Sequence, residues 1–135
     1  MTVAMRRSWL WAVVLLIVFA LGPALSPVIA DSHCQVTFSR GWATGTGQAR
    51  IVMRNTGQPC EGTLYADPDA RTFADTLQVV SQPSNGVVSV SPPRFSYTPN
   101  AGYVGRDRFE LRGAGGARGG RRITLGGEVT VQVNP

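Results

Sequence analysis

The chain has 135 residues, which is enough for one domain and too few for a long array of domains. Its net charge of +5 is carried by arginine without any lysine, and it contains one histidine and two cysteines. One histidine and two widely spaced cysteines do not provide the ligands of a zinc site.

The first 30 residues have the composition of a secretory signal peptide. Arg6 and Arg7 precede an uninterrupted apolar stretch over residues 9–21, and a glycine–proline pair then ends it. Small residues at 28 and 30 complete the order of charged, apolar and small segments, which predicts cleavage after Ala30. An uncleaved anchor is the alternative, but a membrane-crossing helix needs about 20 apolar residues. We therefore expect residues 31–135 to work in the periplasm or outside the cell, with no stable membrane anchor.

The processed part of the chain keeps both cysteines, Cys34 and Cys60. An even pair in an exported chain predicts a disulfide, because the compartment outside the cytoplasm is oxidising. Once Arg6 and Arg7 are removed, the net charge falls to about +3, which is ordinary for a soluble domain.

Short alternating segments follow from residue 34 onward. Apolar and polar residues alternate with period two, and turn residues separate the segments, which predicts strands rather than helices. We expect strands over residues 34–39, 49–54, 60–66, 77–81, 87–91, 94–98, 108–112 and 123–133. About eight short strands predict an all-β sandwich of two antiparallel sheets, with a barrel as the alternative.

The intervening segments carry turn signals. Residues 67–75 are expected to be irregular, with one helical turn inside residues 70–74. The run Pro83–Gly86 predicts a hairpin turn, because Asn85-Gly86 accepts the positive φ that tight hairpins need. Residues 113–120 are expected to form a glycine-rich loop.

Part of the second half of the chain has a recognisable pattern. The run Pro83–Val90 is followed by Phe95–Phe109 and by alternating valines up to Val133. Residues 77–133 thereby resemble the bacterial Ig-like, cadherin-like repeats of secreted and surface proteins. The residues of the motif are Asn85, Gly86, Tyr97, Pro99, Gly102, Tyr103, Gly105, Asp107 and Phe109. The resemblance implies a Greek-key sandwich that serves as a spacer, an adhesive module or an accessory domain.

The side-chain chemistry of two motif residues, Tyr103 and Asp107, suggests a structural role for each. We expect the Tyr103 ring to pack over the edge of the core with its hydroxyl hydrogen-bonded. We expect Asp107 to accept backbone N–H groups from the tight loop over residues 99–105.

The front of the domain resembles the opening of bacterial cellulose-binding modules, through Cys34–Phe38, Trp42 and Asn55–Gly57. Such modules stack exposed aromatic rings on sugars. A carbohydrate-binding function of this kind requires Trp42, together with Tyr65 or Tyr103, to be exposed on one flat face. Trp42 as a cap on one end of the sandwich is the alternative.

Charged residues suggest two further sites. Arg118, Arg121 and Arg122 cluster in the glycine-rich segment and, with the arginines at 106, 108 and 112, suggest a surface for lipopolysaccharide, a polyanionic glycan or an acidic protein. A solvated hairpin is the alternative.

Asp67, Asp69 and Asp75 could offer oxygens to a calcium ion. The alternative is a turn, which an Asp-Pro-Asp run forms more often. We therefore predict that the protein holds no metal or cofactor.

No arrangement of residues indicates catalysis. The single histidine, His33, stands next to the processed N-terminus, and no serine lies in a nucleophile elbow. We therefore predict no enzyme, but an exported Ig-like binding or structural module that contacts a protein or glycan of the cell envelope. An unpaired sheet edge is the expected docking surface. Nucleic acid is not an expected partner, because basic residues are not interleaved with aromatic ones.

Overall fold

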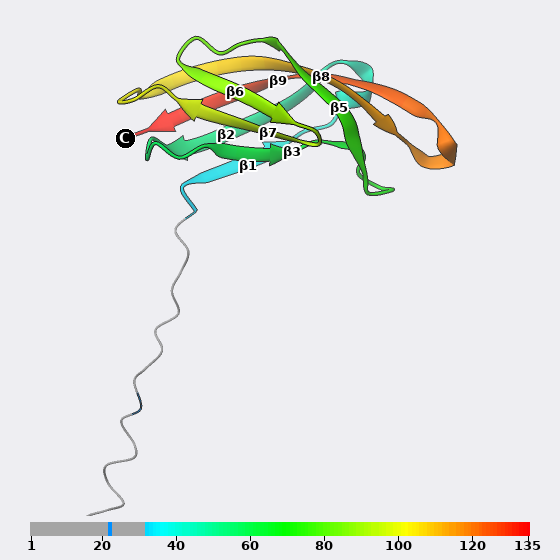
Figure 1. Cartoon of the computed structure of the whole chain (residues 1–135), viewed down its shortest axis with the longest axis horizontal. Helices are drawn as coiled ribbons and strands as arrows, with labels where there is room; N and C mark the ends of the chain where they lie inside the picture. Colours follow the sequence, from blue (N-terminus) through cyan, green and yellow to red (C-terminus); the bar gives the residue numbers. More distant parts are fainter. Residues whose placement is uncertain (1–21, 23–31) are drawn as a thin grey trace, which may run out of the picture. The chain divides into compact units, whose positions relative to one another are not determined.

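The structure, a computed structural model, describes Gly22 and residues 32–135 (Figure 1). The predicted signal peptide and its cleavage site after Ala30 lie outside the described residues, apart from Gly22, and stay a prediction. Residues 32–135 form a unit of their own. In the described part of the chain, no helix is long and apolar enough to cross a membrane.

The domain is built from strands in two sheets, which confirms the predicted all-β sandwich (Figure 1). One sheet has the strand order β1-β2-β9-β8-β5-β4, and the other has the order β3-β7-β6. The expectation that both sheets are antiparallel is wrong at one pair, because β2 pairs in parallel with β9, whereas the other pairs are antiparallel. The strands are β1 (Cys34–Phe38), β2 (Gly47–Arg54), β3 (Cys60–Thr63), β4 (Tyr65–Asp67), β5 (Thr72–Ser81), β6 (Gly86–Ser91), β7 (Arg94–Pro99), β8 (Gly105–Gly116) and β9 (Arg122–Asn134), with short 3-10 helices η2 (Trp42–Thr44) and η3 (Arg118–Gly120).

The alternation of side chains explains why these strands pack into two layers. In β2, Ala49, Ile51 and Met53 are buried, and the residues between them are exposed or half-buried. Rings from the two sheets meet in the core, where Phe109 of β8 stacks on Tyr97 of β7 with ring centroids 6.0 Å apart. Burying one such ring stabilises the fold by about 1.5–3 kcal/mol, so the sandwich is held mainly by this layer of apolar contacts.

The predicted strand over residues 60–66 is in fact two strands in different sheets. β3 pairs with β7, and β4 pairs with β5. The chain changes sheets at the buried Leu64, whose N–H donates to the Pro93 carbonyl at 2.9 Å and whose carbonyl accepts from the Ala74 N–H at 3.0 Å. An apolar residue flanked by two alternating segments does not reveal such a crossing in the sequence.

The predicted hairpin over Pro83–Gly86 is wrong. β5 and β6 belong to different sheets, so the segment between them is a crossover. Gly86 begins β6 and does not have a positive φ. Its lack of a side chain has another reason: a Cβ there would lie 2.6 Å from the Tyr97 ring and 2.7 Å from the Thr98 carbonyl.

Two other local expectations are corrected by longer strands. Thr72 begins β5, so residues 70–74 contain no helical turn. β8 runs to Gly116, so the glycine-rich segment is a strand up to that residue, and the turn covers only the residues between β8 and β9. A Cβ at Gly115 would lie 2.5 Å from the Ala66 Cβ and 2.6 Å from the Phe73 carbonyl oxygen, so only glycine fits where β8 passes close to β4.

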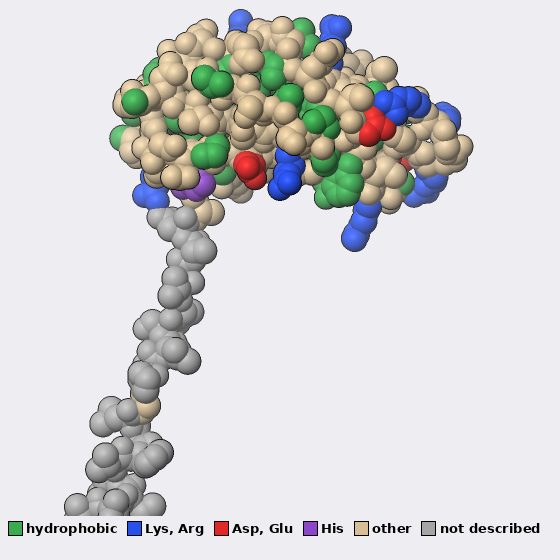
Figure 2. Space-filling model, viewed as in Figure 1, with side chains coloured by type: hydrophobic (Ala, Val, Ile, Leu, Met, Phe, Trp, Pro, Cys, Tyr) green, Lys and Arg blue, Asp and Glu red, His purple; other side chains and the backbone are tan. Residues whose placement is uncertain are grey.

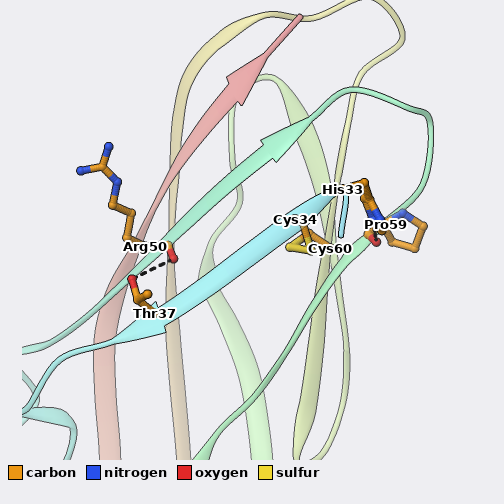
Figure 3. Close-up of a disulfide and its surroundings, with 6 residues drawn as sticks. All are labelled: His33, Cys34, Thr37, Arg50, Pro59 and Cys60. Carbon is orange, nitrogen blue, oxygen red and sulfur yellow. Dashed lines mark hydrogen bonds between the residues drawn. A yellow bond between two sulfur atoms is a disulfide. The ribbon is translucent and has the colours of Figure 1, made fainter. Parts of the chain in front are cut away.

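The predicted disulfide between Cys34 and Cys60 is confirmed (Figure 3). It joins β1, an edge of the six-stranded sheet, to β3, an edge of the three-stranded sheet, with 5.8 Å between the two Cα atoms. Next to it, His33 Nε2 lies 3.0 Å from the Pro59 carbonyl oxygen. The disulfide therefore closes the sandwich along one side.

Candidate functional site

Trp42 is not an exposed sugar-stacking residue, so its carbohydrate-binding role is wrong and its alternative role as a buried residue of the sandwich holds. It is only 8% exposed, and its ring packs over Gly47 and edge-to-face against Phe38, with 6.0 Å between the ring centroids. Tyr103 is half-buried, and its hydroxyl donates to the Arg106 carbonyl. Tyr65 is exposed but stacks on Phe73 at 4.8 Å, so the predicted flat face of Trp42 and tyrosines does not exist.

Asp107 accepts hydrogen bonds from a different loop than expected. Its carboxylate accepts from the Ser84 N–H at 3.0 Å, from the Asn85 N–H at 2.9 Å and from the Tyr97 hydroxyl at 2.9 Å. Burial, together with the hydrogen bond to this carboxylate, raises the pKa of Tyr97 well above its usual value. The carboxylate therefore fixes the crossover between β5 and β6 onto β7 and β8.

The other motif residues shape the loop between β7 and β8. Gly102 and Gly105 have φ values of 74° and 142°, which residues with a side chain rarely adopt. Asn55, which the sequence marked only through the resemblance to cellulose-binding modules, donates from Nδ2 to the carbonyls of Asn100 and Tyr103 at 2.9 and 3.0 Å. These contacts lie within the fold, so the motif residues have a structural role.

The predicted arginine cluster lies at the turn between β8 and β9, and the carboxylates of Asp67 and Asp75 are in contact with it. Arg118 and Arg121 are exposed. Arg122 forms a bidentate pair with Asp75, with both N···O distances at 2.7 Å. This pair lowers the pKa of Asp75 and raises that of Arg122.

Asp67 connects the same turn to the neighbouring one. Its carboxylate accepts from the N–H groups of Asp69 and Ala70, both at 3.1 Å, and from the Arg118 N–H at 3.2 Å. The hydrogen bond from Ala70 is the largest cause that lowers the pKa of Asp67. Within the described residues, no three metal-ligating side chains gather, so Asp67, Asp69 and Asp75 do not form the calcium site that the sequence suggested.

The arginines of β8 do not extend this cluster into one basic patch. Arg108 lies 3.9 Å from Glu128, and Glu110 separates Arg108 from Arg112 along the strand. Figure 2 accordingly shows blue side chains scattered over the face in view, with red ones among them.

A polar groove of about 950 Å³ lies on the outer face of the six-stranded sheet. On each strand of its floor, exposed side chains alternate with buried ones that belong to the core, such as Leu77 and Leu111. The uncharged polar side chains of the floor are Gln48 of β2, Thr76 and Gln78 of β5, and Thr124 of β9. No sequence pattern predicted this groove, because its residues come from four strands and a loop.

The loop between β1 and β2 forms one wall of the groove. A Cβ at Gly126 of β9 would point outward and lie 3.4 Å from the Gly45 Cα, so the loop passes closely over the sheet there. The Gly41 carbonyl accepts from the N–H groups of Thr44 and Thr46 at 3.1 and 3.0 Å, and Trp42 holds the loop from the core side. The wall is therefore fixed by hydrogen bonds and by a buried ring.

Three charged residues line the groove. Glu110 and Glu128 are directly opposite each other on β8 and β9, and Arg112 lies two residues beyond Glu110. Like charges in this position destabilise a sheet by about 0.2–1 kcal/mol. Glu128 has Arg108 at 3.9 Å, whereas no ion pair involves Glu110 in the part of the chain that the structure describes.

The two packed sheets with a parallel β2–β9 pair and a three-stranded β3-β7-β6 layer define an Ig-like sandwich. A family model described as "Bacterial Ig domain" matches residues 42–133, and the chain belongs to this family. The match begins at Trp42, so β1 and Cys34 precede it. No curated protein matches the chain. Domains of this family are generally non-catalytic, and such domains with a disulfide are typical of extracellular or surface proteins.

Proposed function

We propose that the protein is an exported, non-catalytic Ig-like module that contacts a protein or glycan of the cell envelope through the polar groove of the six-stranded sheet. The observation that supports this most is the groove itself, a hollow of about 950 Å³ with a fixed wall. Binding sites in general are concave and have a few convergent polar groups.

The groove suits this role better than the sheet edges do. β1 and β3 are edges joined to each other by the disulfide, and β4 has only three residues. At the β6 edge, the side chain of Gln82 accepts a long hydrogen bond of 3.4 Å from the Val88 N–H. Short or covered edges are poor templates for an added strand.

The groove also suits the role better than the arginine turn does. Asp67 and Asp75 accompany Arg118, Arg121 and Arg122 there, so the turn carries charges of both signs. A polyanion would approach these carboxylates as well as the arginines, which weakens the attraction.

The test is binding of the protein, exported from the full-length chain, to isolated cell envelopes of the native organism. The variant E110Q/R112A changes the groove and removes one charge of each sign, so the net charge stays the same. The variant R118A/R121A changes the turn and leaves the Arg122–Asp75 pair intact. We expect saturable binding that the groove variant loses and the turn variant keeps.

Two results would contradict the proposal. If the exported protein shows no saturable binding to envelopes, the module does not act by contact there. If the turn variant loses binding while the groove variant keeps it, and added salt weakens the complex, then the contact is electrostatic and lies at the arginines.

A further inference from the structure

The chemistry of the groove narrows the class of ligand that it can take. Its floor offers the amides of Gln48 and Gln78 and the hydroxyls of Thr76 and Thr124. On its wall, the Thr44 hydroxyl already donates to the Gly41 carbonyl and bonds to the Thr46 hydroxyl, so these two threonines leave acceptors for a ligand but no free donor. Amide and hydroxyl groups both donate and accept hydrogen bonds. A ligand that fills this groove must therefore present many groups of both kinds along its length.

The charges in the groove argue against a charged polymer. The lining contains two acidic residues, Glu110 and Glu128, and one basic residue, Arg112. A second arginine, Arg108, lies next to Glu128. Because the signs are nearly balanced, neither a polyanion nor a polycation gains from the whole surface.

An apolar anchor also has no place to bind. The leucines of the floor, Leu77, Leu111 and Leu125, are at most 8% exposed and belong to the core. Protein partners usually insert aromatic or aliphatic side chains into apolar pockets at the centre of an interface, and this groove provides none.

Glu110 is the most informative residue of the lining. It faces Glu128 across the strand pair, an arrangement that disfavours folding, and it has no ion pair within the described residues. An ionised carboxylate only accepts hydrogen bonds. A ligand with hydroxyl groups would supply the donors that no residue in the described part of the chain provides to Glu110. Residues that break a local rule of stability without compensation are expected at functional sites.

We propose that the groove binds an uncharged polysaccharide, whose hydroxyl groups donate to Glu110 and Glu128 and exchange hydrogen bonds with Gln48, Gln78 and the floor threonines, Thr76 and Thr124. This inference rests on the proposed function and names the class of its ligand. The ligand extends along the sheet between the wall at Thr44–Thr46 and the strand β5.

The experiment is calorimetric titration of the exported protein with uncharged β-linked oligosaccharides of glucose and of N-acetylglucosamine, at low and high salt. Heparin is the anionic probe. The groove variant is Q78A/E110Q, and the matched control Q35A/E61Q makes the same two changes on β1 and β3, away from the groove. Chemical denaturation of each variant checks the fold.

We expect at least one neutral oligosaccharide to bind with an affinity that salt changes by less than twofold. The groove variant should lose at least tenfold in affinity, whereas the control should stay within twofold of the unchanged protein. Because E110Q removes the repulsion with Glu128, the groove variant should unfold at no lower denaturant concentration than the control.

Three results would overturn the inference: no binding of any neutral oligosaccharide, equal losses in the groove variant and the control, or tighter and salt-sensitive binding of heparin. These results leave the proposed function standing if envelope binding still requires Glu110 and Arg112. If envelope binding itself is absent, the proposed function fails together with its ligand.

Discussion

Asp107 shows how a single residue connects the sequence motif to the fold. The motif predicts a carboxylate that accepts backbone N–H groups, and the structure provides such contacts at Ser84 and Asn85. The sequence could not show that this carboxylate would bind the segment between β5 and β6, because the residues of that crossover carry the same turn signals as a hairpin. Tyr97, buried in the core, reaches the same carboxylate with its hydroxyl.

Asp107→Asn should therefore destabilise the domain. The amide has one oxygen to accept hydrogen bonds, and its NH₂ group would face a backbone N–H, so at least one donor loses its partner. We expect a loss of about 2 kcal/mol in the free energy of unfolding, typical of a hydrogen bond to a charged group. Urea denaturation at neutral pH measures it, with Glu61→Gln on the exposed side of β3 as the control. Equal stability of the two variants would contradict the role given to Asp107.

Gly62 of β3 is a second residue whose identity follows from a contact across the core. A Cβ on Gly62 would overlap the ring of Phe95, which is 1% exposed and has no room to move. We expect Gly62→Ala to cost about 1–3 kcal/mol, as overpacking of a core generally does.

The matched control is Gly116→Ala at the end of β8. A Cβ there meets nothing within 4 Å, and the residue does not have a positive φ. Thermal unfolding should show a clear drop in Tm for Gly62→Ala and none for Gly116→Ala. A similar drop in both would mean that the ring of Phe95 is not what excludes a side chain at residue 62.

At the scale of strands, the alternation of side chains predicted most elements, and the errors have one cause. Residues 49–54 and 94–98 lie in strands as expected, because each has a buried and an exposed side. The strand expected over 34–39 is also present but ends at Phe38, and its inward residues Cys34 and Val36 are only half-buried. The failures concern where the chain changes sheets, at Leu64 and between β5 and β6. Alternation reports which side of a strand is buried, but not which neighbour the strand pairs with.

The disulfide is the element-scale feature that the sequence predicted best. It fastens β1, which precedes the family match, to β3 across a separation of 26 residues. We expect the variant C34S/C60S to lose about 3–4 kcal/mol of stability, since the bond limits the unfolded chain. Denaturation with and without dithiothreitol measures this loss: the reductant should destabilise the unchanged protein and leave the variant as it was. An unchanged protein that is insensitive to full reduction would contradict the prediction.

The Asp75–Arg122 pair makes the connection of β5 to β9 dependent on pH. The folded-state pKa of Asp75 lies below the ordinary 3.8, so its contribution to stability is present above that value and is lost as the pH falls through the lowered pKa. We expect the Tm difference between the unchanged protein and Asp75→Asn to be present at neutral pH and to disappear only after the pH has fallen below 3.8 and through the lowered pKa. Thermal scans across this range measure it, and a difference that stays constant would show that the pair is not responsible.

At the scale of the molecule, the sequence predicted the class of fold but not the binding surface. The run from Asn85 to Phe109 carries the family pattern, and those residues turn out to organise loops and core. The groove, in contrast, depends on the register that brings Gln78, Arg112 and Gly126 side by side and on a loop held over β9. Register between strands distant in sequence is set by packing of the whole sandwich, so no local pattern indicates it.

Export decides whether this surface can meet an envelope partner at all, and it can be tested on the whole chain. The order of charged, apolar and small residues predicts cleavage after Ala30, which removes the apolar stretch and leaves Asp31 as the first residue. When the full-length chain is expressed in its native organism, intact-mass analysis of the periplasm and the medium should find residues 31–135, two mass units lighter than the reduced form because of the Cys34–Cys60 bond. Replacing Leu15 and Leu16 with Arg should block export, because the apolar stretch is then interrupted, and the full-length chain should accumulate in the cytoplasm with free thiols. Recovery of the uncleaved chain in the membrane fraction would instead identify the stretch as an anchor, and the groove would then act on a partner next to the membrane that holds it.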